Sequence, residues 1–196
     1  MAWKPLYVPV AEMADHVRLD AGDAYAIQIT TAAARAVDGA CGRQFGQLDT
    51  PAERVYEGAR AVQLDDGRWL LPIDDVQVTT GLTVDVDGSV VAAGVDGYRL
   101  WPRNQAAEGK PYEALSLATR PVGDVLVVAQ YGWSAVPDEV KVAAKLQGNR
   151  WAIRRESPYG IAGSATEGTA VNLTARLDPD ARGVLAAAGL IRVVRP

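Results

Sequence analysis

The stretch YGWSAVPDEVKVAAKLQGNRWAIRRESPYG, residues 131–160, predicts one long helix with a clear signal at each end. Pro137 suits the first helical turn, where its missing N–H leaves no hydrogen bond unmade, and the two acidic residues after it favour the positive end of the helix dipole. Three arginines favour the negative end: Arg150, Arg154 and Arg155. We therefore expect a helix over residues 137–155 that stops at the serine, proline and glycine beyond it.

This helix would carry buried-type side chains on two neighbouring faces. Helical spacing groups them into two sets, with Val140, Ala144, Gln147 and Trp151 on one face and Val142, Leu146 and Ile153 on the next. A stripe this wide predicts contacts on two sides. Gly148 costs a helix about 1 kcal/mol relative to alanine, so its presence predicts close packing at that position.

Two further helices are expected before this one. VAEMADHVRL, from Val10, has apolar residues at helical spacing, and Asp23 can cap a second helix that stops at Gly42. One stripe of that second helix is made almost entirely of small residues: Ala26, Ile29, Ala33, Ala36 and Ala40. So many alanines on one face allow close approach to another helix.

Residues 53–131 lose the helical spacing and show short β-type runs between turn signals. The runs are RVYEG, AVQL, WLLPI, VQVTT, LTVDVDGSVVAA, YRLWP, EALSLA and VLVVAQY. Asp-Gly within VDVDGSVV predicts a hairpin, because glycine tolerates the positive φ of a tight turn. Prolines separate several of the runs: Pro72, Pro102, Pro111 and Pro121. We expect a meandering antiparallel β insertion of about 75 residues, by the usual lengths of strands and loops.

The C-terminal part combines a loop with a short helix. Residues 156–175 are rich in glycine and serine, Asp178 can cap a helix that has Pro179 in its first turn, and the tail IRVVRP is apolar and basic.

The predicted fold is therefore α+β: a small helical bundle with an antiparallel β insertion between the N-terminal helices and the long third helix, plus a C-terminal arm. We expect one structural domain overall. Its parts are the N-terminal helices (1–52), the insertion (53–133), the long helix (134–156), and the loop and arm (157–196).

Composition limits the function classes. The 196 residues are 48% hydrophobic and 22% charged, which is ordinary for a soluble globular protein. The net charge of −4 argues against a dedicated nucleic-acid binder, which is usually basic. The N-terminus lacks an apolar run of signal-peptide type, and nothing approaches the roughly 18–20 apolar residues of a membrane span. We expect a chain made in the cytoplasm.

Catalytic motifs are sparse. His16 is the single histidine and Cys41 the single cysteine, too few nitrogen and sulfur ligands for a zinc site and without the sequence setting of a catalytic triad. We interpret His16 as a helix-surface residue and Cys41 as a small buried one, and we expect neither a cofactor nor a metal.

Two acidic doublets, Asp65–Asp66 and Asp74–Asp75, could supply oxygen ligands to a divalent cation, but their settings DDG and IDD are more typical of turns. The segment RWAIRRE could hold phosphate, compensate a helix dipole or form a subunit interface, and the acidic total favours the last two.

The order of several motifs resembles the head–tail connector (adaptor) family of long-tailed, double-stranded DNA phages, in its actinophage-like form. The N-terminal half carries three of them. AAARAVDGACGRQFG resembles the family's helix that ends in a Cys-Gly-Arg-x-Phe-Gly motif, TPAERVYEG its entry into the β insertion, and DDVQVTTGLTVDVDG its acidic turn and strand. The residues that match are Cys41, Gly42, Arg43, Phe45, Gly46, Arg54, Tyr56 and Asp74.

The C-terminal half continues the resemblance, which thereby covers nearly the whole chain in order. YRLWPRNQAAEGKPYEAL is similar to the family's Pro-x-Asn … Gly-x-Pro-Tyr segment, YGWSAVPDEVKVAA to its helix entry, RRESPYGIAG to its helix exit, and DPDARGVL to its C-terminal element. The matching positions are Pro102, Asn104, Gly109, Pro111, Tyr112, Tyr131, Gly132, Trp133, Val136, Pro137, Val140, Arg154, Arg155, Ser157, Pro158 and Gly160.

The resemblance implies a structural role in the virion, at the neck, and no enzymatic activity. Such proteins form a ring, usually twelve-fold, below the portal protein at the capsid vertex. The ring extends the DNA channel, lets the double-stranded genome pass without sequence-specific binding, and receives a stopper or tail-terminator protein. No membrane and no cofactor are implied.

Two sets of residues are then candidates for contacts. A ring needs one patch that binds a different patch on its neighbour, and we assign the inter-subunit interface to Trp133, Val142, Leu146, Trp151, Arg154 and Arg155. We assign docking on the portal to the C-terminal arm, through Leu185, Leu190, Ile191, Arg192, Val193, Val194 and Arg195. The alternatives are another phage neck or tail-completion protein, and a metal-dependent enzyme that uses the acidic doublets.

Overall fold

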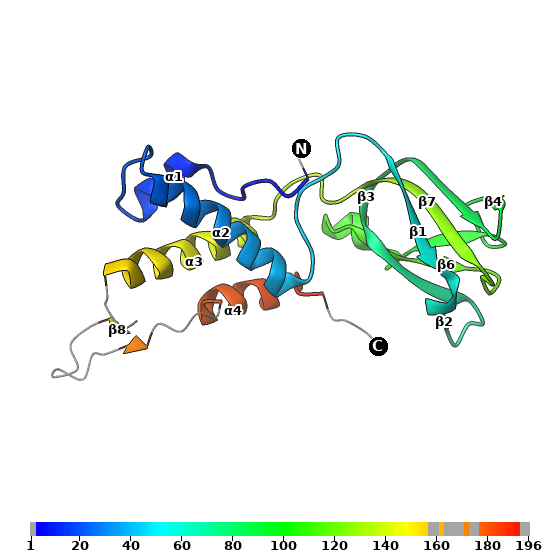
Figure 1. Ribbon diagram of the computed structural model, residues 1–196. Helices are drawn as coiled ribbons and strands as arrows, with labels where there is room; N and C mark the ends of the chain where they lie inside the picture. Colours follow the sequence, from blue (N-terminus) through cyan, green and yellow to red (C-terminus); the bar gives the residue numbers. More distant parts are fainter. Residues whose placement is uncertain (1–2, 157–160, 163–170, 173–176, 193–196) are drawn as a thin grey trace. The chain divides into compact units, whose positions relative to one another are not determined.

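The computed structural model describes residues 3–156, 161–162, 171–172 and 177–192 (Figure 1). The chain divides into two compact units. The β unit comprises Met1–Lys4 and Gly46–Ala135, and the helical unit comprises Pro5–Phe45 and Val136–Pro196. Helices and an antiparallel sheet thus lie in one chain, as an α+β protein requires.

The helical unit contains the helices α1 (Val10–His16), α2 (Ala24–Cys41), α3 (Asp138–Glu156) and α4 (Pro179–Ala187), and the short antiparallel pair β8 (Ile161–Ala162) and β9 (Val171–Asn172). The predicted caps are confirmed. The Asp23 carboxylate accepts a hydrogen bond from the N–H of Tyr25, Gly42 ends α2 in the left-handed conformation, and Asp178 accepts from two N–H groups of the first turn of α4. Each cap occupies a backbone group that the helix itself leaves unpaired.

The core between α2 and α3 is built from small side chains. On α2 the buried positions are Ala26, Ile29, Thr30, Ala33, Ala34, Val37 and Cys41, and on α3 they include Val140, Ala143, Ala144 and Gln147. Ala36 and Ala40, which the spacing placed on the buried stripe of α2, are only half-buried. The stripe is therefore rotated from the predicted one toward Val37 and Cys41.

Gly148 lies where α3 meets α1, and the predicted close packing at this position is confirmed. A Cβ atom added at Gly148 would lie 2.5 Å from the Met13 sulfur. Met13 is fully buried, so its side chain has no open space into which to retreat. The same two helices are joined at the surface by an ion pair between Lys145 and Glu12, 2.5 Å apart.

We predict opposite effects of alanine at two helical glycines. Gly39 in α2 has nothing within 4 Å of an added Cβ, so Gly39→Ala should raise the free energy of unfolding by about 0.5–1 kcal/mol through helix propensity alone. Gly148→Ala gains the same propensity but overpacks against Met13, which costs typically 1–3 kcal/mol. Urea unfolding of both variants checks this, and a Gly148→Ala protein more stable than Gly39→Ala would contradict the close contact.

The β unit is built on one seven-stranded sheet. Its strands are β1 (Ala52–Glu57), β2 (Val62–Gln63), β3 (Trp69–Val86), β4 (Ser89–Val91), β5 (Tyr98–Trp101), β6 (Tyr112–Leu117) and β7 (Asp124–Tyr131), with short 3₁₀ turns at Gly58–Arg60 and Gln105–Glu108. The order is β1-β7-β3-β6-β5, with β2 and β4 also paired to β3, and every strand pairing is antiparallel. An antiparallel insertion is thus confirmed, with β1 and β5 at its two ends.

The length of β3 corrects three sequence predictions. The runs WLLPI, VQVTT and LTVDV are one strand of 18 residues, which continues through Pro72 and Gly81. Its first part pairs with β6 and its last part with β7, and the register to β7 shifts between Val78 and Thr83. A shift of this kind lets one strand bend and serve both halves of the sheet. Asp74 and Asp75 therefore lie in a strand and not in the predicted turn, whereas Asp65 and Asp66 do lie in a turn.

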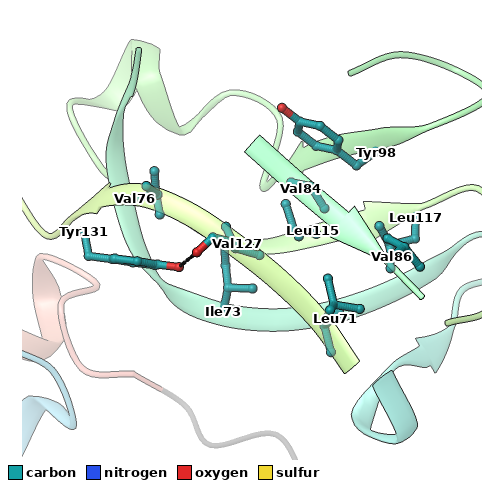
Figure 2. Close-up of a cluster of buried hydrophobic side chains, with 12 residues drawn as sticks. Leu71, Ile73, Val76, Val84, Val86, Tyr98, Leu115, Leu117, Val127 and Tyr131 are labelled. Carbon is teal, nitrogen blue, oxygen red and sulfur yellow. Dashed lines mark hydrogen bonds between the residues drawn. The ribbon is translucent and has the colours of Figure 1, made fainter. Parts of the chain in front are cut away.

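The side chains of the β core come from both parts of β3 and from its neighbours. Figure 2 shows Leu71, Ile73 and Val84 of β3 among residues of β6 and β7. Tyr131 is fully buried, and its hydroxyl donates to the Val127 carbonyl at 2.8 Å (Figure 2). Burial raises the pKa of Tyr131 far above its ordinary value, so this hydroxyl remains a donor throughout the physiological range.

The predicted Asp-Gly hairpin is confirmed between β3 and β4. Asp87 and Gly88 have φ values of 53° and 82°, as a tight hairpin turn requires. The Asp87 carboxylate accepts hydrogen bonds from the backbone N–H groups of Val122 (3.0 Å) and Gly123 (2.5 Å). These two bonds lower the pKa of Asp87. The turn is thereby joined to the loop that precedes β7.

This capping of the loop should depend on pH. The pKa of Asp87 is lower in the folded than in the unfolded chain, so its stabilisation is present above the unfolded value of about 4 and is lost as pH falls through the folded pKa. We expect wild type to melt higher than Asp87→Ala at neutral pH and the difference to shrink in acid. Melting curves of both proteins from pH ~7 to ~2 measure it, and a constant difference would contradict this role for the charge.

Candidate interaction surfaces

The two faces predicted for α3 differ in exposure. The first packs inside the helical unit, with Val140 and Ala144 buried. On the second, Val142 and Ile153 are 46% and 41% exposed, and Leu146 between them is half-buried. Leu146 lies four residues after Val142, one turn along the same side of the helix. The described part of the chain thus leaves an apolar strip of Val142, Leu146 and Ile153, here called the α3 strip, open on the helical unit.

The arginines at the end of α3 have separate roles. Arg150 pairs with Asp178 at 3.0 Å, with both side chains largely buried, and so joins α3 to the cap of α4. Arg155 lies over the Tyr25 ring at 4.5 Å and 3.9 Å from an Asp23 oxygen. Arg154 is exposed, close to the α3 strip in sequence. Only Arg154 and part of Arg155 are therefore open to a partner.

The two tryptophans proposed for the interface lie in different places. Trp151 is half-buried at the end of α3, where its carbonyl accepts a hydrogen bond from the Tyr25 hydroxyl at 2.9 Å. Trp133 is 2% exposed in the β unit, and its indole N–H donates to the buried carboxylate of Asp75 at 2.8 Å. Because Trp133 is enclosed in this way, we leave it out of the interface proposed below.

The proposed docking arm is partly a core element. Leu185 and Leu190 are 0% and 3% exposed and pack in the helical unit. Ile191 and Arg192 are half-buried, and the Arg192 N–H donates to the Cys41 carbonyl at the end of α2. The remaining arm residues, Val193, Val194 and Arg195, lie outside the described residues. The arm's first half is thus attached to α2 and α3, which leaves Ile191 and Arg192 as its accessible described part.

The acidic doublets do not converge. Asp74 pairs with Arg54, Asp75 with Trp133, and Asp66 accepts from the backbone of its own turn. Among the residues that the structure describes, no three His, Cys, Asp or Glu side chains are grouped so as to hold a metal ion.

The single histidine and the single cysteine occupy the predicted positions. His16 is exposed at the end of α1, and Cys41 is buried at the end of α2, where burial raises the pKa of its thiol to about 11. A thiol with so high a pKa is almost entirely protonated at neutral pH and a poor nucleophile.

Arg54, which the sequence singled out only by resemblance, is the centre of an aromatic stack. Its guanidinium lies 4.1 Å from the centroid of the Tyr131 ring and 4.9 Å from that of Trp3, and it pairs with Asp74 at 2.6 Å. The hydroxyl of Tyr56 donates to the same carboxylate at 3.0 Å. This cluster attaches the N-terminal segment and β1 to β3 and β7, by contacts between residues far apart in the sequence.

Lysine cannot replace Arg54 in this stack, because its ammonium group has no planar face to lie between two rings. We expect Arg54→Lys to lower the free energy of unfolding by about 1–2 kcal/mol, mostly through lost cation–π and ion-pair contacts. Denaturant unfolding measures this. Arg60→Lys, at an exposed arginine in the turn after β1, is the matched control and should change nothing; equal effects at both positions would contradict the stack.

No protein-family model and no curated protein matches the sequence. A solved structure described as the neck of an empty GTA particle, computed with C6 symmetry, contains a chain that is 25% identical to this one. The match covers 100% of this chain and 95% of the other, with a TM-score of 0.49. Within the described residues, none of the helices has the length and apolarity needed to cross a bilayer.

Proposed function

We propose that this chain is a structural neck protein of a phage-like particle, a head-to-tail adaptor that forms a ring below the portal. The observation that carries the proposal is the α3 strip, because a helix already buried on one face keeps a second apolar face open. The sequence resembles the connector family in the order of its motifs over nearly the whole chain, and this resemblance is the reason for proposing a ring below the portal.

The α3 strip suits a ring contact. Full burial of one large aliphatic side chain contributes about 1.5–3 kcal/mol, and these three are already partly covered, so the strip supplies a fraction of that. A stable interface covers about 800 Å² on each partner, which is more than three side chains provide. We therefore place the strip at the centre of a larger contact that includes Arg154, since arginine is commonly enriched in interfaces. Trp151 lies on the other face of α3, with Val140 and Ala144, and is left out of this contact.

The proposed adaptor role also includes portal docking, a downstream partner and passage of DNA. The C-terminal arm docks on the portal through Ile191, Arg192 and the residues after them, and a stopper or tail-terminator protein binds below. The net charge of −4 disfavours strong binding of the ring to DNA phosphates, so that double-stranded DNA slides through its lumen. The ring is twelve-fold, as is usual in the family that the sequence resembles, and the protein is a component of the virion.

A different neck or tail-completion protein is the second candidate, since it could use the same strip in another ring. An acidic-site enzyme has weaker support, because Asp66, Asp74 and Asp75 are each engaged with a different partner.

The first experiment is mass measurement by light scattering, with the purified chain alone and then mixed with portal-bearing, DNA-filled capsids that lack tails. A twelve-fold mass, or stoichiometric recruitment of monomers to the portal vertex, supports the adaptor. A ring of another order that ignores the portal favours the second candidate. A monomer that ignores the capsids overturns both.

A double variant tests the α3 strip. Both residues of Val142→Asp/Ile153→Asp are exposed, so the melting temperature should change little, since surface substitutions usually stay within about 0.5 kcal/mol. Ring formation or recruitment should fall at least about tenfold, because two carboxylates would be buried without partners. Val62→Asp, at a valine that is 57% exposed in the β unit, is the matched control. Unchanged assembly of the double variant would exclude the strip.

A further inference from the structure

Strand β1 leaves one complete edge of the sheet unpaired. It pairs with β7 so that Glu57 lies opposite Asp124, and just beyond it the Gly58 N–H donates to the Gly123 carbonyl at 3.0 Å. Because antiparallel strands alternate the direction of their backbone groups, residues 52, 54 and 56 face β7 while Glu53, Val55 and Glu57 face outward. Among the described residues, no backbone hydrogen bond covers these outward groups.

The side chains on this edge select its partner. Glu53, Val55 and Glu57 are all exposed, and neither glutamate has an ion pair within the described residues. Pairing of β1 with β1 of a second copy, centred on Val55, would place Glu53 opposite Glu57 twice. Like charges directly opposite one another destabilise a strand pair. The edge therefore disfavours a symmetric dimer and requires a partner with positive charge.

Such a surface lies at the other end of the same sheet. A pocket of about 530 Å³ lies beside β5, lined by Thr79, Leu82, Ala93, Gly94, Tyr98, Arg99, Leu100, Arg103 and Tyr112. Within the described residues, neither Arg99 nor Arg103 has an ion pair. Tyr98 lies at the border of the core with its hydroxyl directed away from the other labelled side chains (Figure 2). The pocket thus combines two free arginines with apolar and aromatic walls.

A third arginine lies close to this pocket, and the carboxylates of Asp66 and Asp96 also lie near it. Arg68, buried close by, donates to the Ser116 hydroxyl and to the carbonyls of Val95, Gly97 and Ser116. All four acceptors are neutral, so the charge of Arg68 is held without a paired carboxylate. The backbone of Tyr98 bonds to Ala92 and Gly94 on its outer side, and by alternation the same side of Leu100 is open.

We propose that β1 of one copy docks in the β5 pocket of the next copy, so that Glu53 and Glu57 pair with Arg99 and Arg103. This inference rests on the proposed ring and names a second contact in it, separate from the α3 strip. Glu53 and Glu57 are about 13 Å apart along a strand, while Arg99 lies in β5 and Arg103 in the turn directly after it. Val55 faces the apolar wall. Because the two surfaces lie at opposite ends of one sheet, the contact is heterologous and can repeat around a ring.

Charge reversal with rescue tests this pairing. We expect Glu53→Arg/Glu57→Arg and, separately, Arg99→Glu/Arg103→Glu each to weaken self-association at least about tenfold, equivalent to about 1.4 kcal/mol. The chain that carries all four changes should recover most of the lost self-association. An equimolar mixture of the two variants should also associate, because the reversed edge of one variant then meets the reversed pocket of the other. Sedimentation velocity across a concentration series measures association. Arg18→Glu/Arg182→Glu, at exposed arginines of the helical unit, is the matched control.

Disulfide trapping gives a second measurement that does not depend on Arg99 variants folding. Val55→Cys/Ala93→Cys places one thiol on the β1 edge and one at the pocket, while the native Cys41 is buried. Mild oxidation should give a ladder of cross-linked copies. Val55→Cys alone should give none.

Three outcomes would overturn the pairing: no rescue by the combined reversals, a cross-linked dimer from Val55→Cys alone, or a wild type that does not associate together with a Val55→Cys/Ala93→Cys chain that does not cross-link. If the arginine reversals instead abolish binding to a short DNA duplex in fluorescence polarisation and leave association unchanged, the pocket is a phosphate site. Recruitment to portal-bearing capsids is measured on the same variants. If the variants are recruited as well as wild type, the edge contact is overturned and the adaptor role is not. If wild type itself is not recruited, the adaptor role is overturned.

Discussion

The close approach of α3 to the other helices is the constraint on which the helical unit depends. α3 contacts α1, α2 and α4, and it can do so because its inner side carries glycine and alanine where larger side chains would hold the helices apart. Gly148 leaves room for the Met13 side chain, and Ala143 and Ala144 are buried. With little side-chain volume inside, only one face of α3 is needed for the core. The second face is consequently free to carry apolar residues that the unit itself does not bury.

Polar contacts complete the same arrangement. Gln147, buried on α3, accepts the N–H of Asp178, while the Asp178 carboxylate pairs with Arg150 and caps α4. One aspartate thus begins a helix and ties it to another. The C-terminal segment then returns to α2, where Arg192 bonds to Cys41. These contacts explain why part of the predicted docking arm is structural: its leucines are needed to cover α3.

The sequence predicted features whose signals are local. Asp23, Gly42, Asp178 and the Asp87–Gly88 turn were identified because each is decided by a few neighbouring residues. The continuity of β3 was missed, since Pro72 and Gly81 usually interrupt strands and only the pairing with β6 and β7 shows that they do not. The burial of Trp133 on Asp75 and the stacking of Arg54 were missed for the same reason: their partners lie far away in the chain.

The charges make the clearest contrast between composition and structure. The net charge of −4 says only that acidic residues are in excess, whereas the fold separates charges that are used internally from charges that are not. Arg54, Arg68 and Arg150 are held by partners within the chain, while Glu53 and Glu57 at one end of a sheet and Arg99 and Arg103 at the other have no ion pair among the described residues. With β1 of one copy docked beside β5 of the next, as proposed, each pair of copies leaves one β1 edge and one β5 edge unused, because the two surfaces lie at opposite ends of one sheet. Further copies can then add at both ends, and the assembly is finite only where the row of copies closes into a ring.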